Sequence, residues 1–176
     1  FLPGDQDFAH GEQFLADISK KHQFKFLISN LKAHSKIKHK KWIAKKFANQ
    51  NIVFVGILEP SLLLPKYRNL FESPYVSIKN TLKDIKEKMG DLKDLKIVLL
   101  SHSGMDFDKK FAKSFPDINW IIGSHSQAFT QLTVDIDDTK IVQVLSRNHY
   151  LGHIKIPANN KAKDSFKVIE VRDELK

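Results

Sequence analysis

The chain contains no cysteine among its 176 residues. Disulfide bridges, thiolate metal sites and cysteine nucleophiles are therefore excluded. The absence fits either a reducing cytoplasm or an exported protein that needs no cross-links. Cysteine chemistry thus plays no part in whatever this chain does.

Long hydrophobic runs are missing as well. No stretch approaches the roughly 18 apolar residues of a membrane-spanning helix, and no signal peptide is visible. The chain begins at Phe1 rather than at a methionine, so we expect a fragment or a processed product. A hydrophobic content of 41% is enough for one domain with a core. Without repeats, low-complexity tracts or linkers, residues 1–176 are predicted to form a single domain.

Arginine is scarce, with only Arg68, Arg147 and Arg172, although the net charge is +9. Much of the lysine surplus lies in residues 34–46, HSKIKHKKWIAKK. Such a stretch can attract nucleic acid, acidic lipid or an anionic substrate. Nucleic-acid-binding surfaces favour arginine with interleaved aromatic residues, and here only Trp42 is interleaved. We interpret the stretch as a solvated face and expect no nucleic-acid partner, with a basic binding module as an alternative.

Hydrophobic periodicity predicts an alternating α/β pattern, followed by a strand-rich end. Predicted helices cover 12–22, 78–89 (capped by Gly90) and 107–115. Predicted strands cover 24–29, 42–47, 52–57, 97–100, 120–122, 130–136, 141–145, 153–156 and 166–172. Turns are predicted at 49–51, 137–139 and 159–160.

Two Ser-His-Ser tripeptides each follow a short apolar run. Residues 97–100 lead into His102, and residues 120–123 lead into His125. Ligands of open α/β sheets bind beyond the carboxyl ends of the strands, and imidazole is a common ligand of zinc and similar ions. A single histidine after a strand is more often structural, but two in the same context 23 residues apart favour a shared metal or phosphate site. Gln127 would return to the side of His125 on an extended backbone and add an amide oxygen.

Two carboxylates surround a turn near the start of the chain, in Gly4-Asp5-Gln6-Asp7. Paired carboxylates suit a divalent cation. They equally suit an ordinary turn or a helix N-terminus. The residues alone favour the structural interpretation.

Four blocks in this order resemble one family: Ser101-His102-Ser103-Gly104, Pro116-Asp117-Ile118-Asn119, Gly123-Ser124-His125-Ser126-Gln127 and Tyr150-Leu151-Gly152. From Gly4 to roughly Arg172 the chain is similar to the C-terminal part of the metallophosphoesterase (calcineurin-like) domain of bacterial periplasmic 5'-nucleotidases and UDP-sugar hydrolases. The resemblance implies an α/β fold, a layered β-sandwich flanked by helices and incomplete at its N-terminus.

The resemblance also implies roles for individual residues. His102 and His125 would be metal ligands, and Gln127 would bind the partner ion. Asp5 stands where the family has a metal-binding asparagine, and Gln6 replaces its transition-state histidine. Gln6 can donate a hydrogen bond but cannot deliver a proton to a leaving oxygen. No catalytic residue of the family is therefore retained in this stretch.

By the same resemblance, two further metal-binding blocks would lie upstream of Phe1, so this chain holds at most half of a two-metal site. The implied function is hydrolysis of a phosphate ester, nucleotide-like, by water activated between two divalent ions, zinc or manganese. Export to the periplasm is implied too. This stretch alone is expected to be inactive. The alternative is a degenerate, non-catalytic domain of the same fold that acts as a binding module.

Overall fold

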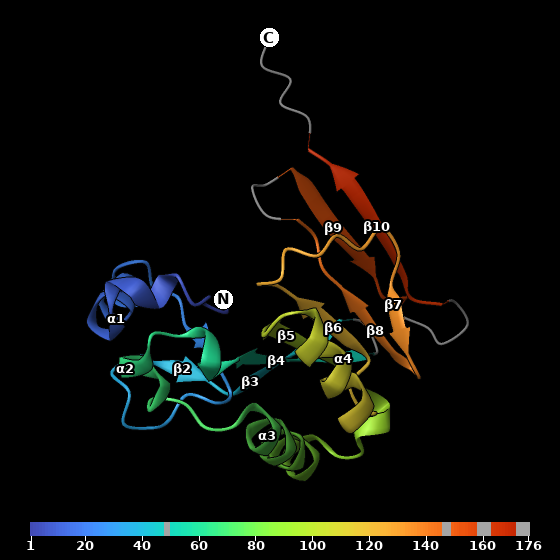
Figure 1. The fold of residues 1–176 in the computed structure, drawn as a ribbon. Helices are drawn as coiled ribbons and strands as arrows, with labels where there is room; N and C mark the ends of the chain where they lie inside the picture. Colours follow the sequence, from blue (N-terminus) through green and yellow to red (C-terminus); the bar gives the residue numbers. More distant parts are fainter. Residues whose placement is uncertain (48–49, 146–148, 158–162, 172–176) are drawn as a thin grey trace.

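A six-stranded mixed sheet forms the centre of the computed structural model, which describes residues 1–47, 50–145, 149–157 and 163–171 (Figure 1). The strand order is β3-β4-β5-β6-β8-β7. The four inner strands run parallel and the two outer strands antiparallel to their neighbours. Their bounds are β3 Trp42–Phe47, β4 Gln50–Leu58, β5 Leu95–His102, β6 Trp120–Gly123, β7 Val134–Ile136 and β8 Thr139–Val142.

Two helices cover one face of this sheet, α3 (Pro74–Met89) and α4 (Met105–Ser114) (Figure 1). Both are amphipathic, and their apolar sides meet alternate residues of the strands, as the periods of helix and strand require. The 3-10 turn η3 (Leu92–Asp94) connects α3 to β5. Together these elements form the largest core, whose fully buried members include Ile78, Ile85, Phe111, Val53, Ile57, Ile97, Leu99 and Ile121.

An antiparallel strand pair, β9 (Tyr150–Lys155) and β10 (Ser165–Glu170), forms a second layer on the other face. Ile154 and Phe166 of this pair pack against Trp120 at the centre of the sheet. The indole Nε1 of Trp120 donates to Asp164 Oδ2 at 2.8 Å, which satisfies its buried N–H. The predicted layered α/β fold is confirmed.

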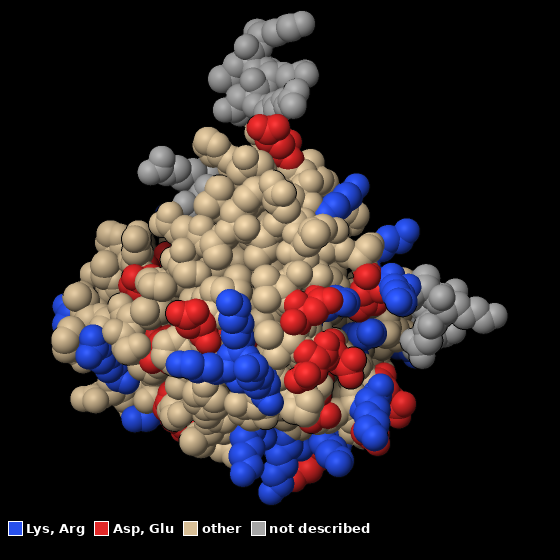
Figure 2. Space-filling view, turned by 45° about the vertical axis from the view of Figure 1, so that its right-hand side comes forward, with Lys and Arg blue, Asp and Glu red and all other residues tan. Residues whose placement is uncertain are grey.

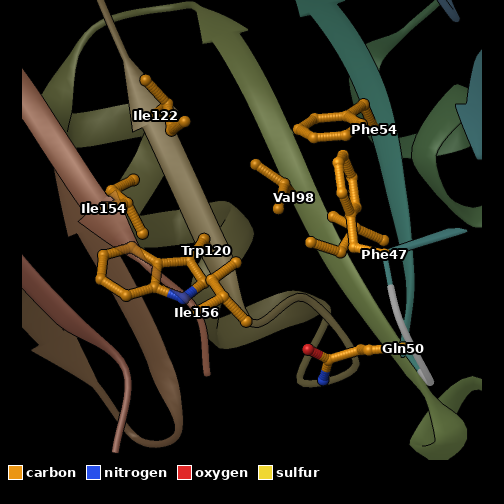
Figure 3. A pocket seen from close by; sticks show the side chains of 9 residues that line it. Phe47, Gln50, Phe54, Val98, Trp120, Ile122, Ile154 and Ile156 are labelled. Atoms are coloured by element: carbon orange, nitrogen blue, oxygen red, sulfur yellow. The ribbon is translucent and has the colours of Figure 1, made fainter. Parts of the chain in front are cut away.

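An apolar groove lies between this strand pair and the sheet (Figure 3). Its volume is about 440 Å³, and its wall carries only the Gln50 amide and the Trp120 indole as polar side-chain groups. Among the described residues, none that line the groove is an acid, a base or a histidine. It is lined by Phe47, Gln50, Ile52, Phe54, Val98, Trp120, Ile122, Ile154 and Ile156.

Segments from the first 71 residues build a separate small core beside the sheet. Its elements are η1 Asp7–His10, α1 Glu12–Lys21, β1 Phe26–Leu27, β2 His39–Lys40, η2 Pro60–Leu62 and α2 Pro65–Arg68. The buried Asn30 side chain joins this part to the end of β4: its Nδ2 donates to Leu58 O at 2.7 Å, and its Oδ1 accepts from Leu58 N at 3.3 Å. These bonds fix Asn30 at the carboxyl end of β4, and Leu27 N of β1 donates to Phe1 O at 2.8 Å, which ties the first residue of the chain to this part.

Gly56 on β4 allows β1 to cross close to the sheet, and we expect Gly56→Ala to destabilise the fold. A Cβ at this position would lie 2.0 Å from the backbone oxygen of Leu27. A backbone atom cannot rotate away, so the strand must shift, and overpacking of this kind costs about 1–3 kcal/mol or more. Urea denaturation of both proteins measures the difference. A loss below about 0.5 kcal/mol, the usual scatter of neutral substitutions, would contradict this close approach.

Most predicted elements are confirmed, with a few corrections. The Gly90 cap is confirmed: its N–H bonds Lys86 O at the end of α3. The strand predicted at 130–136 begins only at Val134, because the backbone and hydroxyl of Thr130 bond the backbone of Gln143 instead of a neighbouring strand. The strand predicted at 24–29 is only β1. The turn at 159–160 and parts of the turn at 49–51 lie outside the described residues.

Charges of both signs share the surface. Figure 2 shows one face on whose lower half basic and acidic side chains are interspersed, while its upper centre is largely without charge. On α3, exposed side chains form the pairs Lys83–Glu87 and Lys88–Asp84. Pairs of this kind stabilise little, so they indicate a solvated surface. Within the described ranges, no helix is both long and apolar enough to cross a membrane.

Candidate metal centre

His102 and His125 lie together at the carboxyl edge of the sheet. His102 is the last residue of β5, and β6 ends at Gly123, which pairs with Ser101. Because the two strands are parallel neighbours, their ends deliver both imidazoles to the same place. The ring centroids are 5.2 Å apart, with the planes at 71°. The convergence of the two histidines that the sequence predicted is therefore present in the structure.

Hydrogen bonds hold the loop that carries His125 on two sides. Ser126 Oγ donates to Gln143 Oε1 at 2.7 Å, beyond the end of β8, and accepts from Met105 N at 3.2 Å. Gly104 N donates to Ser124 O at 3.1 Å. His125 has a φ of +79°, a conformation that L-residues seldom adopt. These bonds offset the strain and hold the imidazole at the sheet edge.

The first turn of the chain brings a carboxylate to the two rings. Asp7 Oδ2 accepts from Gly4 N at 2.7 Å, which closes the turn. A Cβ on residue 4 would lie 2.8 Å from His102 Cε1, so glycine lets the backbone approach the ring. Asp5 Oδ1 is then 2.7 Å from His102 Nε2 and 3.4 Å from His125 Nδ1. Of the two carboxylates in this turn, Asp7 has a structural role and Asp5 faces the histidines.

The environment of Asp5 favours its ionised form. Partial burial raises the pKa of Asp5, but the hydrogen bond with His102 and the proximity of His102 and His125 together lower it, so the net shift is downward. The side chains of His102, Asp5 and His125 are 16%, 25% and 35% exposed. The cluster is therefore anionic on one side and open to solvent, from which an ion can enter.

The geometry of the cluster fits a divalent ion. One ligand atom from each of Asp5, His102 and His125 lies within 4.8 Å of the others. Around zinc, tetrahedral ligand atoms at bond lengths near 2.1 Å are about 3.4 Å apart, which is the distance between the Asp5 and His125 atoms. Asp5 Oδ1 and His102 Nε2 are closer, at 2.7 Å, in a direct hydrogen bond that an entering ion would have to replace. Two imidazoles and a carboxylate are also a donor set that zinc and manganese accept. These three residues could hold one such ion.

Gln127 and Gln6 are the other two residues that the sequence predicted at this site. The prediction that an extended backbone returns Gln127 to the side of His125 is wrong, since Gln127 has a φ of +51° and His125, two residues before it, has a φ of +79°. Its role as a ligand stays a prediction. Gln6 is exposed beside Asp5, in an ordinary right-handed helical conformation at the start of η1.

Two residues near the cluster were missed by sequence reasoning. Ser124 bonds His102, as its Oγ lies 2.9 Å from Nδ1. Asp108 of α4 is fully buried against Gly123, where a Cβ would come within 2.1 Å of its Oδ2. The sequence did carry a signal for Asp108, since it is a carboxylate at a position where the helical period of α4 turns the side chain toward the sheet. Ser124 carried no signal that distinguishes it from an ordinary turn residue.

The chain is similar in sequence to two mammalian 5'-nucleotidases. No family model matches the chain. A mouse 5'-nucleotidase is 24% identical over 186 aligned residues, which cover 90% of this chain and 32% of that protein. The bovine 5'-nucleotidase is 25% identical with the same coverage. The chain thus spans about a third of the length of the curated relatives it matches.

Solved structures of 5'-nucleotidases share the fold of this chain. A putative 5'-nucleotidase from Staphylococcus aureus superimposes with a TM-score of 0.79 at 17% identity, covering 97% of this chain and 37% of that chain. A 5'-nucleotidase precursor from Thermus thermophilus gives 0.75 at 20% identity, covering 95% and 38%. The resemblance to 5'-nucleotidases is confirmed. It supports descent from a hydrolase family of nucleotidase type, and the partial coverage fits a C-terminal portion.

One further structural neighbour shows that the fold alone does not determine the substrate. The sulfate thiohydrolase SoxB from Thermus thermophilus superimposes with a TM-score of 0.74 at 17% identity, covering 91% of this chain and 30% of that chain. That protein's name describes action on a sulfur compound rather than on a nucleotide. The same architecture therefore occurs in proteins whose names describe different substrates, and the substrate must be argued from the site.

Proposed function

We propose that this chain contributes one half of a divalent-metal centre in a phosphoric ester hydrolase that acts on a nucleotide-like substrate. The observation that carries the proposal is the meeting of Asp5, His102 and His125 at the sheet edge, with ligand atoms within 4.8 Å. Three segments far apart in the sequence supply them. Similarity to 5'-nucleotidases over 90% of the chain supports the reaction class and the nucleotide-like substrate.

Each residue of the centre has a defined part in this proposal. His102 and His125 would donate nitrogen lone pairs to zinc or manganese, Asp5 would add negative charge, and Gln127 would reach the partner ion. When bound, such ions polarise a phosphate ester and lower the pKa of water. The remaining ligands would come from a longer protein in which residues 1–176 form part of a metallophosphoesterase domain, and the resemblance favours an exported one.

The alternative is a non-catalytic domain of the same fold that binds a partner or retains one metal ion. Gln6 favours it, because an amide cannot protonate a leaving oxygen. The similarity to 5'-nucleotidases favours the hydrolase, whereas the meeting of Asp5, His102 and His125 fits both proposals. The two proposals differ in turnover, whereas both permit binding of a metal ion.

Metal-dependent turnover tests the proposal. The longer protein is expected to hydrolyse a nucleoside monophosphate when Mn²⁺ or Zn²⁺ is present and to lose this activity when a chelator removes the ion. His125→Ala is expected to abolish it, since the ion loses one of its three ligands in this chain. Release of inorganic phosphate is the measurement. Activity that survives both chelation and His125→Ala would refute a metal centre here.

The control is a histidine that lies outside the cluster. His22 is exposed at the end of α1, so His22→Ala should leave both turnover and metal binding unchanged. Titration of Mn²⁺ into residues 1–176 separates the two proposals further. Binding that depends on His125 without any turnover by the longer protein would favour the non-catalytic domain.

A further inference from the structure

We propose that three adjoining lysine-lined hollows, together called the lysine surface, bind a linear polyphosphate through its charges alone. Residues of α1, β2, β3 and the second half of α3 contribute to them (Figure 1). Their volumes are about 650, 570 and 690 Å³. None of Asp5, His102 and His125 lines them. The lysine surface is therefore separate from the metal centre and goes beyond the proposed function.

The three hollows form one continuous path. Lys25 lines all three of them. Lys36 and Lys38 are shared by the first and the second hollow, and Lys40 and Lys41 by the second and the third. A continuous path of this kind suits an elongated chain better than a single small ion or a flat membrane.

Positive charge dominates along this path. Nine lysines line it, against three carboxylates, of which Asp84 is already paired with Lys88 at 2.8 Å. Within the described ranges, Lys25, Lys38 and Lys40 are exposed and form no ion pair. Lysines gathered in this way create a positive potential that attracts anions. The lysine surface therefore favours a ligand that carries many negative charges.

The backbone that carries these lysines is held in place by other parts of the chain. The Glu12 carboxylate accepts a hydrogen bond from Lys36 N. Ile28 N donates to Lys40 O at 2.9 Å. Ile37 is buried in the small core, so it anchors the segment from within. A ligand therefore meets ammonium groups on a fixed backbone, and binding requires little further ordering of the chain.

The aromatic rings along the path are engaged within the protein. Trp42 packs against the main core, its indole N–H donates to Asp84 Oδ2 at 2.7 Å, and Lys88 Nζ lies 5.9 Å from the centre of a ring of its indole. Phe24 packs edge-on against Phe26, with ring centroids 5.0 Å apart. Surfaces that bind single-stranded nucleic acid instead present rings on which bases stack. The lysine surface is therefore suited to phosphate groups without bases.

A lipid membrane fits the lysine surface less well than a phosphate chain. Proteins that lie on membranes combine basic residues with apolar side chains that enter the lipid. Among the described residues, no large apolar side chain that lines the path is exposed. The lysine ammonium is a compact point charge that binds phosphate oxygens. A linear polyphosphate supplies such oxygens in close succession, and it needs neither rings nor apolar anchors.

Titration of linear inorganic polyphosphate into residues 1–176, with a chelator present to keep the metal centre empty, tests this binding. The triple variant Lys25→Gln, Lys38→Gln, Lys40→Gln should bind about 100-fold more weakly, at roughly fivefold for each lysine. The slope of log affinity against log salt concentration should become shallower by about two, since each contact between a lysine and a single-stranded phosphate chain contributes about 0.7. Urea denaturation checks that the variant is folded as stably as the wild type.

The matched control removes the same charge from another part of the surface. Lys79, Lys86 and Lys109 are exposed on α3 and α4 and line none of the three hollows. Lys79→Gln, Lys86→Gln, Lys109→Gln should therefore keep the wild-type affinity and salt slope. Equal losses in the two triple variants, or no binding by the wild type, would overturn the lysine surface. Tighter binding of single-stranded RNA, a sulfated glycan or anionic lipid vesicles at the same charge concentration would overturn polyphosphate as its ligand.

Discussion

Replacing Gln6 by histidine is expected to raise the rate of phosphate ester hydrolysis by the longer protein about 10²–10⁴-fold, which is what a positioned general acid contributes. By resemblance, the metallophosphoesterase family has a histidine where this chain has Gln6. Imidazole can deliver a proton to the leaving oxygen near neutral pH, and an amide cannot. Initial rates at saturating Mn²⁺ measure the effect directly.

The fold should tolerate this substitution. Gln6 is exposed, its backbone is in the right-handed helical region, and its side chain makes no cap hydrogen bond with η1. Gln6→Ala, which removes the amide without adding an acid, is the control and should leave the rate unchanged. If Gln6→His binds Mn²⁺ as tightly as the wild type and hydrolyses no faster, the missing histidine is not what limits turnover. That result would favour the non-catalytic alternative.

Local sequence patterns were sufficient to predict the sheet edge and both histidines. Residues 97–100 and 120–122 are short aliphatic runs, and buried parallel strands have this composition. Since parallel strands end at a common edge, His102 and His125 had to approach each other once both runs were strands. The end of α3 was equally local, because Gly90 adopts the left-handed φ that glycine accepts without strain.

Contacts distant in sequence could not be predicted from the residues alone. Asp5 meets His102 across 97 positions of the chain, and the start of the chain is tied to β1 by the bond from Leu27 N to Phe1 O. The role of Asp5 as a metal ligand was predicted only from the family resemblance, because the local sequence pattern favoured an ordinary turn. The direction of Gln127 depended on two left-handed residues that are not glycine, which no propensity favours.

Raising the pH from 5 to 8 is expected to destabilise the wild type more than Asp108→Asn, because burial raises the pKa of Asp108 to about 7. The side chain is fully buried, and among the described residues neither oxygen has a hydrogen-bond partner. Ser101 opposes the rise in pKa only in part, since its hydroxyl lies nearby without the geometry of a hydrogen bond. A buried carboxyl without partners stays protonated to avoid the cost of an unpaired charge.

The sign and size of this effect follow from proton linkage. Between pH 4 and 7 the folded state keeps the proton of Asp108 and the unfolded state, with a pKa near 3.9, has lost it. Stability from this group is therefore fully present below about pH 4 and is lost as the pH rises through 7. A shift of about three units at 1.36 kcal/mol each corresponds to about 4 kcal/mol. Asparagine has nearly the same shape but does not titrate in this pH range, so it removes the pH dependence that comes from Asp108.

Urea denaturation of both proteins at pH 5 and pH 8 measures the difference, and comparing the two cancels all other titrating groups. At pH 8 Asp108→Asn should be the more stable protein, and its advantage should shrink by about 3 kcal/mol at pH 5, two units below the raised pKa. Asp106→Asn is the control, because Asp106 is exposed on the same turn of α4. An equal loss of stability in the wild type and Asp108→Asn would mean that the pKa of Asp108 is not raised and that its carboxylate is ionised in the folded state at both pH values. Gly123, which ends β6 beside the metal centre, would then lie against a charged carboxylate rather than a neutral carboxylic acid.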